Sequence, residues 1–177
     1  TKEGINVLMT NLTGKVPPIL QRLDYIRFNG EAAGYLHDLT LTGLFYTGAG
    51  MVKTDVMMSI DEQSMSRTYS GSVASADLDL GKLLNQEKKF GKVDFNVELK
   101  GFNYKNRYPE SYIKGIISSF EYSQYQYENI MLDGVYKDGG FNGRLSMDDA
   151  NGSVQIDGNF NVAKTIPDFN LKASVKN

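Results

Sequence analysis

The sequence predicts a mostly β protein in which antiparallel, repeated hairpins form a curled sheet, with one or two short helices. Composition is the first reason, because the 177 residues include 18 Gly and only 4 Pro, together with 11 Tyr and 9 Phe. Glycine turns between aromatic and β-branched segments are typical of many short strands. We expect residues 1–177 to form a single β-rich unit, in which residues 1–25 are an N-terminal lead-in with a short helix.

Hydrophobic alternation is the second reason. From Val93 to Leu99, every odd position is apolar and every even position is polar or charged. The same period of two runs through Phe141–Met147, Val154–Val162 and Phe169–Val175. Successive side chains of a strand point to opposite faces, so each segment predicts a strand with one apolar and one wet face. This pattern favours an antiparallel sheet, and a closed β-sandwich or barrel is the alternative arrangement of the same strands.

Turn and helix signals divide the chain between these strands. Asp149–Gly152 contains the Asn-Gly pair that tight hairpins prefer, and Lys137–Gly140 and Thr47–Gly50 occupy equivalent places. Two segments predict short helices, namely Pro17–Asp24, with proline at the helix start, and Leu78–Asn85. Both helices are expected to cap the sheet.

A short element recurs along the chain. It consists of an apolar residue, Asp or Thr, Gly, any residue and an aromatic residue, and it occurs at Leu41–Phe45, Leu132–Tyr136 and Ile156–Phe160. A recurring glycine inside a strand marks a bulge, a bend or a close backbone approach. The repeats therefore predict stacked hairpin units.

Charge and residue types argue against several functions. The net charge of −2 provides no basic patch for nucleic acid. The chain has no cysteine and a single histidine, His37, which is expected to lie at the end of a strand.

Met147–Gly152 partly resembles a calcium loop but lacks the carboxylate at its first position, so it is interpreted as a hairpin turn. We expect no catalytic, metal or cofactor site, and no enzymatic activity.

Aromatic residues gather in the second half of the chain. They predict either a platform that contacts sugar or lipid, or cross-strand pairs that stabilise the sheet. The set comprises Phe120, Tyr122, Tyr125, Tyr127 and Tyr136, with Tyr104, Tyr108 and Tyr112 nearby.

The order of these motifs resembles the TamB/AsmA-like family of Gram-negative envelope proteins. The similarity covers about residues 16–162, and each motif alone is a weakly specific pattern of glycine and apolar residues. The segments that carry it are Ile26–Gly30, Asp38–Leu41, Thr47–Gly50, Tyr69–Gly71, Leu78–Leu84, Ile113–Gly115 and Tyr125–Gly134.

The resemblance implies that the chain is a fragment of a long, periplasm-spanning repeat protein whose parent chain is anchored to the inner membrane. Family members fold a long sheet into a trough with an apolar inside, a β-taco. They are implicated in outer-membrane protein assembly and in phospholipid transport. The implied partners are phospholipid and an outer-membrane barrel protein, the latter through parts of the parent chain that are not present here.

A trough of this kind requires one continuous apolar face. The same residues could instead close on one another as a dry core. The residues expected to line the groove are Val93, Phe95, Val97, Leu99, Ile130, Leu132, Phe141, Leu145, Met147, Val154, Ile156 and Phe160.

Two other functions remain open at this stage. One is a surface β-sandwich that binds carbohydrate or another ligand through its tyrosines. The other is a purely structural spacer repeat whose edge strands pair with neighbours, which predicts self-association through those edges.

Overall fold

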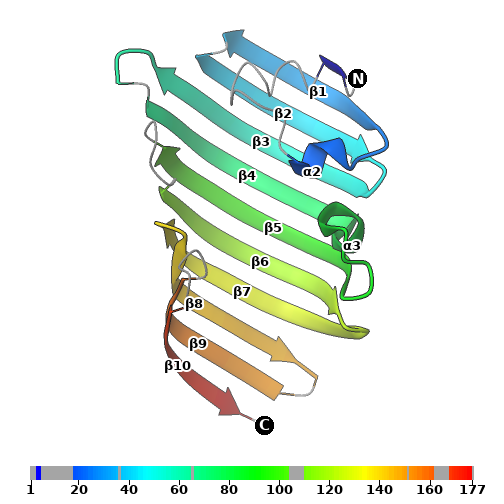
Figure 1. The fold of residues 1–177 in the computed structure, drawn as a ribbon, viewed down its shortest axis with the longest axis vertical. Coiled ribbons are helices and arrows are strands. Elements are labelled where there is room, and N and C mark those ends of the chain that lie inside the picture. The colour runs from blue at the N-terminus through cyan, green and yellow to red at the C-terminus, as the bar shows by residue number, and fades with distance from the viewer. Residues whose placement is uncertain are drawn as a thin grey trace.

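A computed structural model describes residues 3–4, 18–35, 37–64, 66–103, 110–150, 152–161 and 168–176. Ten strands form one antiparallel sheet, and their spatial order is the same as their order in the sequence (Figure 1). The strands are β1 (Ile26–Tyr35), β2 (Asp38–Thr47), β3 (Gly50–Asp61), β4 (Ser66–Asp79), β5 (Phe90–Asn103), β6 (Glu110–Tyr122), β7 (Tyr125–Lys137), β8 (Gly140–Asp149), β9 (Gly152–Asn161) and β10 (Asp168–Lys176).

This arrangement confirms the predicted class, a mostly β protein built from consecutive antiparallel hairpins. The sheet twists progressively from β1 to β10 (Figure 1), as adjacent strands of any sheet do. Across the described strands it is not closed, because β1 pairs only with β2 and β10 pairs only with β9. The alternative of a closed sandwich or barrel is therefore wrong for the part of the chain that the structure describes.

Two of the hairpin turns have positive φ at both central residues. Ser123 and Gln124, with φ of 51° and 68°, connect β6 to β7. Asp138 and Gly139, with φ of 51° and 76°, connect β7 to β8. Turns of this kind match the right-handed twist of the flanking strands, which explains why the strands leave each turn in register. Asn151, in the predicted Asn-Gly turn, lies outside the described residues.

Two short helices lie at one end of the sheet. Helix α2 (Pro18–Gln21) and helix α3 (Leu80–Leu84) fall within the two predicted helical segments, and both are shorter than predicted. Asp79 caps α3, because its carboxylate accepts a hydrogen bond of 2.9 Å from the backbone N–H of Lys82. Asn85 ends α3 in the left-handed conformation, with φ of 57°.

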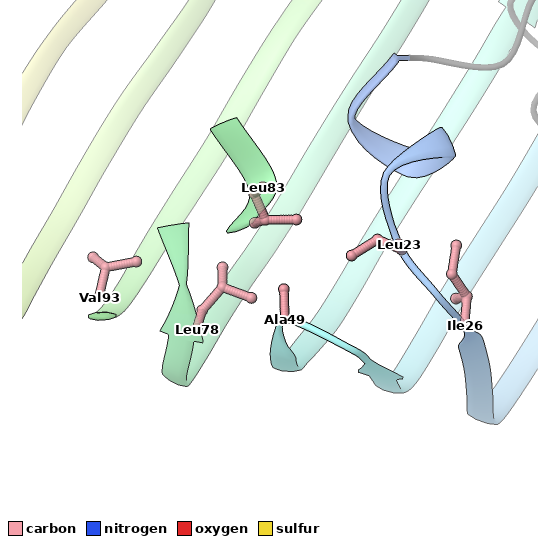
Figure 2. Packing of buried hydrophobic residues seen from close by; sticks show 6 residues of the cluster. All are labelled: Leu23, Ile26, Ala49, Leu78, Leu83 and Val93. Atoms are coloured by element: carbon pink, nitrogen blue, oxygen red, sulfur yellow. The ribbon is translucent and has the colours of Figure 1, made fainter. Parts of the chain in front are cut away.

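The buried core of the described chain is small and lies beside these helices. Leu83 of α3 and Leu23, just after α2, face Ala49 and Leu78 at the end of the sheet (Figure 2). Ile26 and Val93 complete this cluster. Along the rest of the sheet, the apolar side chains are mostly half-buried rather than buried. The helices therefore cover one end of one face, and the site described next lies on the remainder of that face.

Candidate functional site: the apolar face of the sheet

One face of the sheet is apolar across all ten strands. Residues directly opposite each other in adjacent strands project from the same face, so the pairing between strands defines rows that cross the sheet. We name each row by one member. The Leu132 row consists of Gly30, Gly43, Thr54, Val73, Val97, Gly115, Leu132, Leu145, Ile156 and Ala173.

Parallel rows flank it on both sides. Towards the helices, the Ile130 row consists of Phe28, Phe45, Val52, Ser75, Phe95, Ile117, Ile130, Met147, Val154 and Val175. On the other side, the Gly134 row consists of Ala32, Leu41, Val56, Gly71, Leu99, Ile113, Gly134, Gly143, Gly158 and Leu171. A fourth row, the Phe141 row, crosses β7, β8 and β9 at Tyr136, Phe141 and Phe160.

Eleven of the twelve predicted lining residues fall on these rows, and Val93 is the exception. Eight of them belong to the Leu132 and Ile130 rows, and Leu99 belongs to the Gly134 row. Phe141 and Phe160 are opposite each other in the Phe141 row, where Phe160 is placed by its backbone pairing. Val93 is part of the buried cluster beside the helices. The register therefore brings the predicted residues to one face of the sheet.

Three hydroxyl groups on this face, those of Tyr69, Ser75 and Ser111, form hydrogen bonds. The hydroxyls of Tyr69 and Ser111 bond to each other between β4 and β6. Ser75 donates to the backbone carbonyl of Val93 over 3.1 Å. A buried polar group costs little once it is paired, so these hydroxyls do not interrupt the apolar surface.

Glycines let the strands and rings of this face approach closely. Gly134 and Gly143 are paired in the Gly134 row, and the ring of Phe141 lies over Gly134. A Cβ atom at Gly134 would lie 2.4 Å from Cζ of Phe141, and one at Gly143 would lie 2.3 Å from the carbonyl oxygen of Asp133. An aromatic ring that packs over a strand glycine restores the contacts the missing side chain would have made.

No second sheet covers the apolar face within the described residues. The strands contact their neighbours in sequence, and α3 contacts β5 at the covered end. Four rows two residues apart span roughly 20 Å along the strands, and nine strand spacings span roughly 43 Å across them. At the β10 edge, Leu171 is 48% exposed and Val175 is 64% exposed. An apolar surface of this extent is larger than the few hundred Å² that is usual on a monomer.

The opposite face is mostly polar, with Met57, Ile116 and Met131 exposed on it, and it carries ion pairs between strands. Arg144 Nε lies 2.7 Å from Asp157 Oδ1, and Lys114 Nζ lies 3.8 Å from Asp133 Oδ2. The hydrogen bond from Gln155, together with that from Arg144, lowers the pKa of Asp157 below its ordinary value. These groups are exposed, so they favour the pairing of specific strands more than they add stability.

Hollows in the surface lie mainly against this polar face. One of about 590 Å³ is bordered by Met57, Lys100, Phe102 and Tyr112, among others. Others, of about 650 and 460 Å³, lie further along the sheet between β5 and β10. Predicted lining residues contribute little to them, since Met147 and Val154 border the second and Leu132 borders the third. The apolar face is thus a broad surface, and these hollows belong to its reverse side.

The predicted aromatic platform is split by the structure. Rings of Phe120, Tyr122, Tyr125 and Tyr127 do gather at the β6–β7 hairpin, where the centroids of Tyr125 and Tyr127 are 4.6 Å apart. Tyr136 lies near the other end of β7, however, and the exposed Tyr112 donates to Asp133 on the polar face. Tyr104 and Tyr108 lie outside the described residues.

The single histidine and the segment that partly resembles a calcium loop each lie beside a turn of the sheet. His37 stacks on Tyr35 beside the β1–β2 turn, with ring centroids 5.6 Å apart. Asp149 ends β8 and Gly152 begins β9, as expected for a hairpin turn. Within the described ranges, no group of three or more His, Cys, Asp or Glu side chains could hold a metal ion. In the same ranges, no helix has the length and apolar character needed to cross a membrane.

Sequence reasoning missed the N-terminal half of the apolar face. Phe28, Leu41, Phe45, Val56 and Val73 occupy the same rows as the predicted residues. Apolar residues also alternate with polar ones along these strands, but small and hydroxyl residues such as those in β4 interrupt the alternation. Only the register joins both halves into one surface.

A comparison with protein-family models, curated proteins and solved structures finds no match to this chain.

Proposed function

We propose that this chain is part of a non-enzymatic envelope-biogenesis protein of the bacterial periplasm, whose apolar sheet face carries the acyl chains of phospholipids. Its parent chain would support phospholipid transport or outer-membrane protein assembly. The observation that carries the proposal is the apolar face that crosses all ten strands with no second sheet over it in the described part of the chain.

The dimensions of this face suit an acyl chain. A bilayer core of about 30 Å contains two layers of acyl chains, so one chain extends about 15 Å, less than the roughly 20 Å width of the apolar rows. A lipid that buries the equivalent of eight CH₂ groups gains roughly 6 kcal/mol before the cost of immobilisation. Binding of this strength is reversible, which a protein needs if phospholipid is to move along its apolar face.

Native mass spectrometry of the chain, purified without detergent from a bacterial host, tests the proposal directly. We expect a reproducible added mass that fragments as phospholipid. A bare protein mass under conditions that retain lipid on a known carrier would contradict lipid binding by this chain.

The alternation of the strands provides a matched pair of variants. Leu132 and Leu145 are opposite each other on the apolar face, and their chain neighbours Met131 and Ser146 are opposite each other on the polar face. The double variant Leu132→Asn/Leu145→Asn should lose the lipid adduct. The control Met131→Asn/Ser146→Asn should keep it. Equal loss from both variants, with circular dichroism unchanged, would place the lipid elsewhere.

A second candidate is ligand binding by the aromatic patch at the β6–β7 hairpin. Exposure favours it, since Tyr122 and Tyr125 are each 37% exposed beside the turn. Aromatic rings of this kind pack against the apolar faces of sugars. Calorimetric titration with a glucan hexasaccharide should then show binding that Tyr122→Ala/Tyr125→Ala abolishes without loss of folding. Absence of heat with the unaltered chain would remove this candidate.

A further inference from the structure

One row of the polar face carries charges that alternate in sign from strand to strand. Each member lies directly opposite the next, from β5 to β10. Opposite charges facing each other across strands stabilise a sheet, and like charges destabilise it. The sign of one residue in this row therefore predicts the sign of the next. The members are Glu98, Lys114, Asp133, Arg144, Asp157 and Lys172.

Two ion pairs join interior members of this row, Lys114 with Asp133 and Arg144 with Asp157. Asp157 Oδ1 lies 2.7 Å from Nε of Arg144, and its Oδ2 accepts a hydrogen bond of 2.6 Å from Gln155. Both carboxylate oxygens of Asp157 thus already have donors other than Lys172. In the part of the chain that the structure describes, Lys172 forms no direct ion pair.

The same row reaches both edges of the sheet formed by the described strands. Lys172 lies in β10, which forms one edge. Followed the other way, the row passes through Ser72, Asp55 and Thr42 to Glu31 in β1, the opposite edge. One edge therefore presents a cation and the other presents an anion at the same level of the sheet.

We propose that β10 pairs antiparallel with β1 of a second copy of this chain, with Glu31 of that copy directly opposite Lys172. This pairing extends the sequence of alternating charges by one member. It does not depend on lipid binding by the apolar face, so the two proposals fail separately.

Strand direction and hydrogen-bond phase both permit the pairing. Odd and even strands of this sheet run in opposite directions, so β1 of a second copy, placed as an eleventh strand, runs antiparallel to β10. Along one row of a regular antiparallel sheet, hydrogen-bonded and non-hydrogen-bonded pairs alternate. Ten strands contain nine pairs, so the first and last pairs of the row have the same type. A tenth pair between Lys172 and Glu31 then has the other type, as the alternation requires.

The apolar faces also join in this register. Counting along both strands, Leu171 lies opposite Ala32 of the second copy, and Val175 lies opposite Phe28. Leu171 and Val175 are the exposed apolar residues of the β10 edge, at 48% and 64% exposure. Small and aromatic residues from β1 would remove part of that surface from water, which is the main favourable term in such association.

Charge also selects this partner over a second β10 edge. Lysines on an edge strand discourage it from pairing with a copy of itself. A strand with a carboxylate at the matching position escapes that repulsion. Because the two edges differ, the contact is head-to-tail and repeats, so the assembly grows beyond a dimer.

Sedimentation velocity over a range of protein concentrations tests the proposal. We expect species larger than a dimer that increase with concentration. Glu31→Lys places like charges opposite each other and should raise the dissociation constant about two- to thirtyfold. Thr42 is the neighbour of Glu31 within the sheet, so this variant disturbs no charged pair of the folded chain. Glu62→Lys, in the β3–β4 turn, is the charge-matched control and should leave association unchanged.

Two further variants test the register. Lys172→Glu combined with Glu31→Lys restores opposite charges and should recover association lost in Glu31→Lys. The register also places Lys176 opposite Arg27 of the second copy, so Lys176→Glu should strengthen association. A chain that stays monomeric at several hundred micromolar overturns the proposal. So does a dimer that does not grow, or a Glu31→Lys effect no larger than that of Glu62→Lys.

Discussion

Arg22 donates a hydrogen bond from Nη1 to the backbone carbonyl of Leu83 over 2.9 Å, and this contact ties the segment after α2 to the last turn of α3. The two residues are 61 positions apart in the chain. Leu23, the residue after Arg22, and Leu83 both belong to the buried cluster (Figure 2). The bond therefore holds together the only part of the described apolar face that has a helical cover.

Removal of this bond should loosen the helical cover. Arg22→Ala leaves the Leu83 carbonyl without its charged donor, and we expect a loss of about 1 kcal/mol in the free energy of unfolding. Urea denaturation measures the change. Arg27→Ala, which removes an exposed arginine from the polar side of β1, is the control and should have a smaller effect. Equal losses would mean that the bond contributes nothing specific.

Leucines on the two parts of the apolar face should differ in their contribution to stability. Leu78 is 6% exposed beneath the helices, so Leu78→Ala should cost about 2–4 kcal/mol through lost burial and a residual cavity. Leu132 is only half-buried on the uncovered part, so Leu132→Ala should cost about 1 kcal/mol. Chemical denaturation of both variants checks the ratio. A large cost at Leu132 would indicate that its part of the face is packed in solution.

Close strand approach at Gly143 should make that position intolerant of a side chain. A Cβ atom there meets backbone, 2.3 Å from the carbonyl oxygen of Asp133 and 2.5 Å from Cα of Gly134. We expect Gly143→Ala to cost about 1–3 kcal/mol, measured by thermal unfolding. Gly91→Ala is the matched control, because the three atoms nearest its Cβ would all belong to the flexible Glu121 side chain and none to backbone. Its effect should be small, and equal effects would argue against the close approach.

Stability should depend on pH through Asp157. Hydrogen bonds from Gln155 and then Arg144 hold its pKa below the ordinary value of 3.8, so the unfolded chain binds a proton more readily than the folded one. The stabilisation is therefore present above pH 3.8 and is lost as the pH falls through the lower, folded pKa. Asp157→Asn should be less stable than the unaltered chain at pH 7. The difference should vanish in stronger acid, as followed by urea midpoints between pH 2 and pH 7. A difference that persists at pH 2 would contradict this explanation.

Much of the fold followed from local sequence signals. The alternation of β5, β8 and β9 and the turn residues between them predict strands and hairpins, because side-chain period and turn conformation are local properties. The apolar face of β3 and β4 could not be predicted in this way, because residues on it such as Thr54 and Ser75 are polar by type. The splitting of the aromatic platform could not be predicted either, because it depends on how far along β7 each tyrosine lies.

The sequence by itself determined the strands β5, β8, β9 and β10, the turns beside them and the apolar character of one side of each of these strands. It did so because the alternation of apolar and polar side chains and the conformation of a tight turn both depend on residues that are close in sequence. Only the tertiary structure decided that consecutive pairing leaves the sheet open across the described strands, with Glu31 and Lys172 in one row at its two edges. Strand order and closure depend on contacts between residues distant in the chain, and alternation within a strand is the same for an open sheet, a sandwich and a barrel.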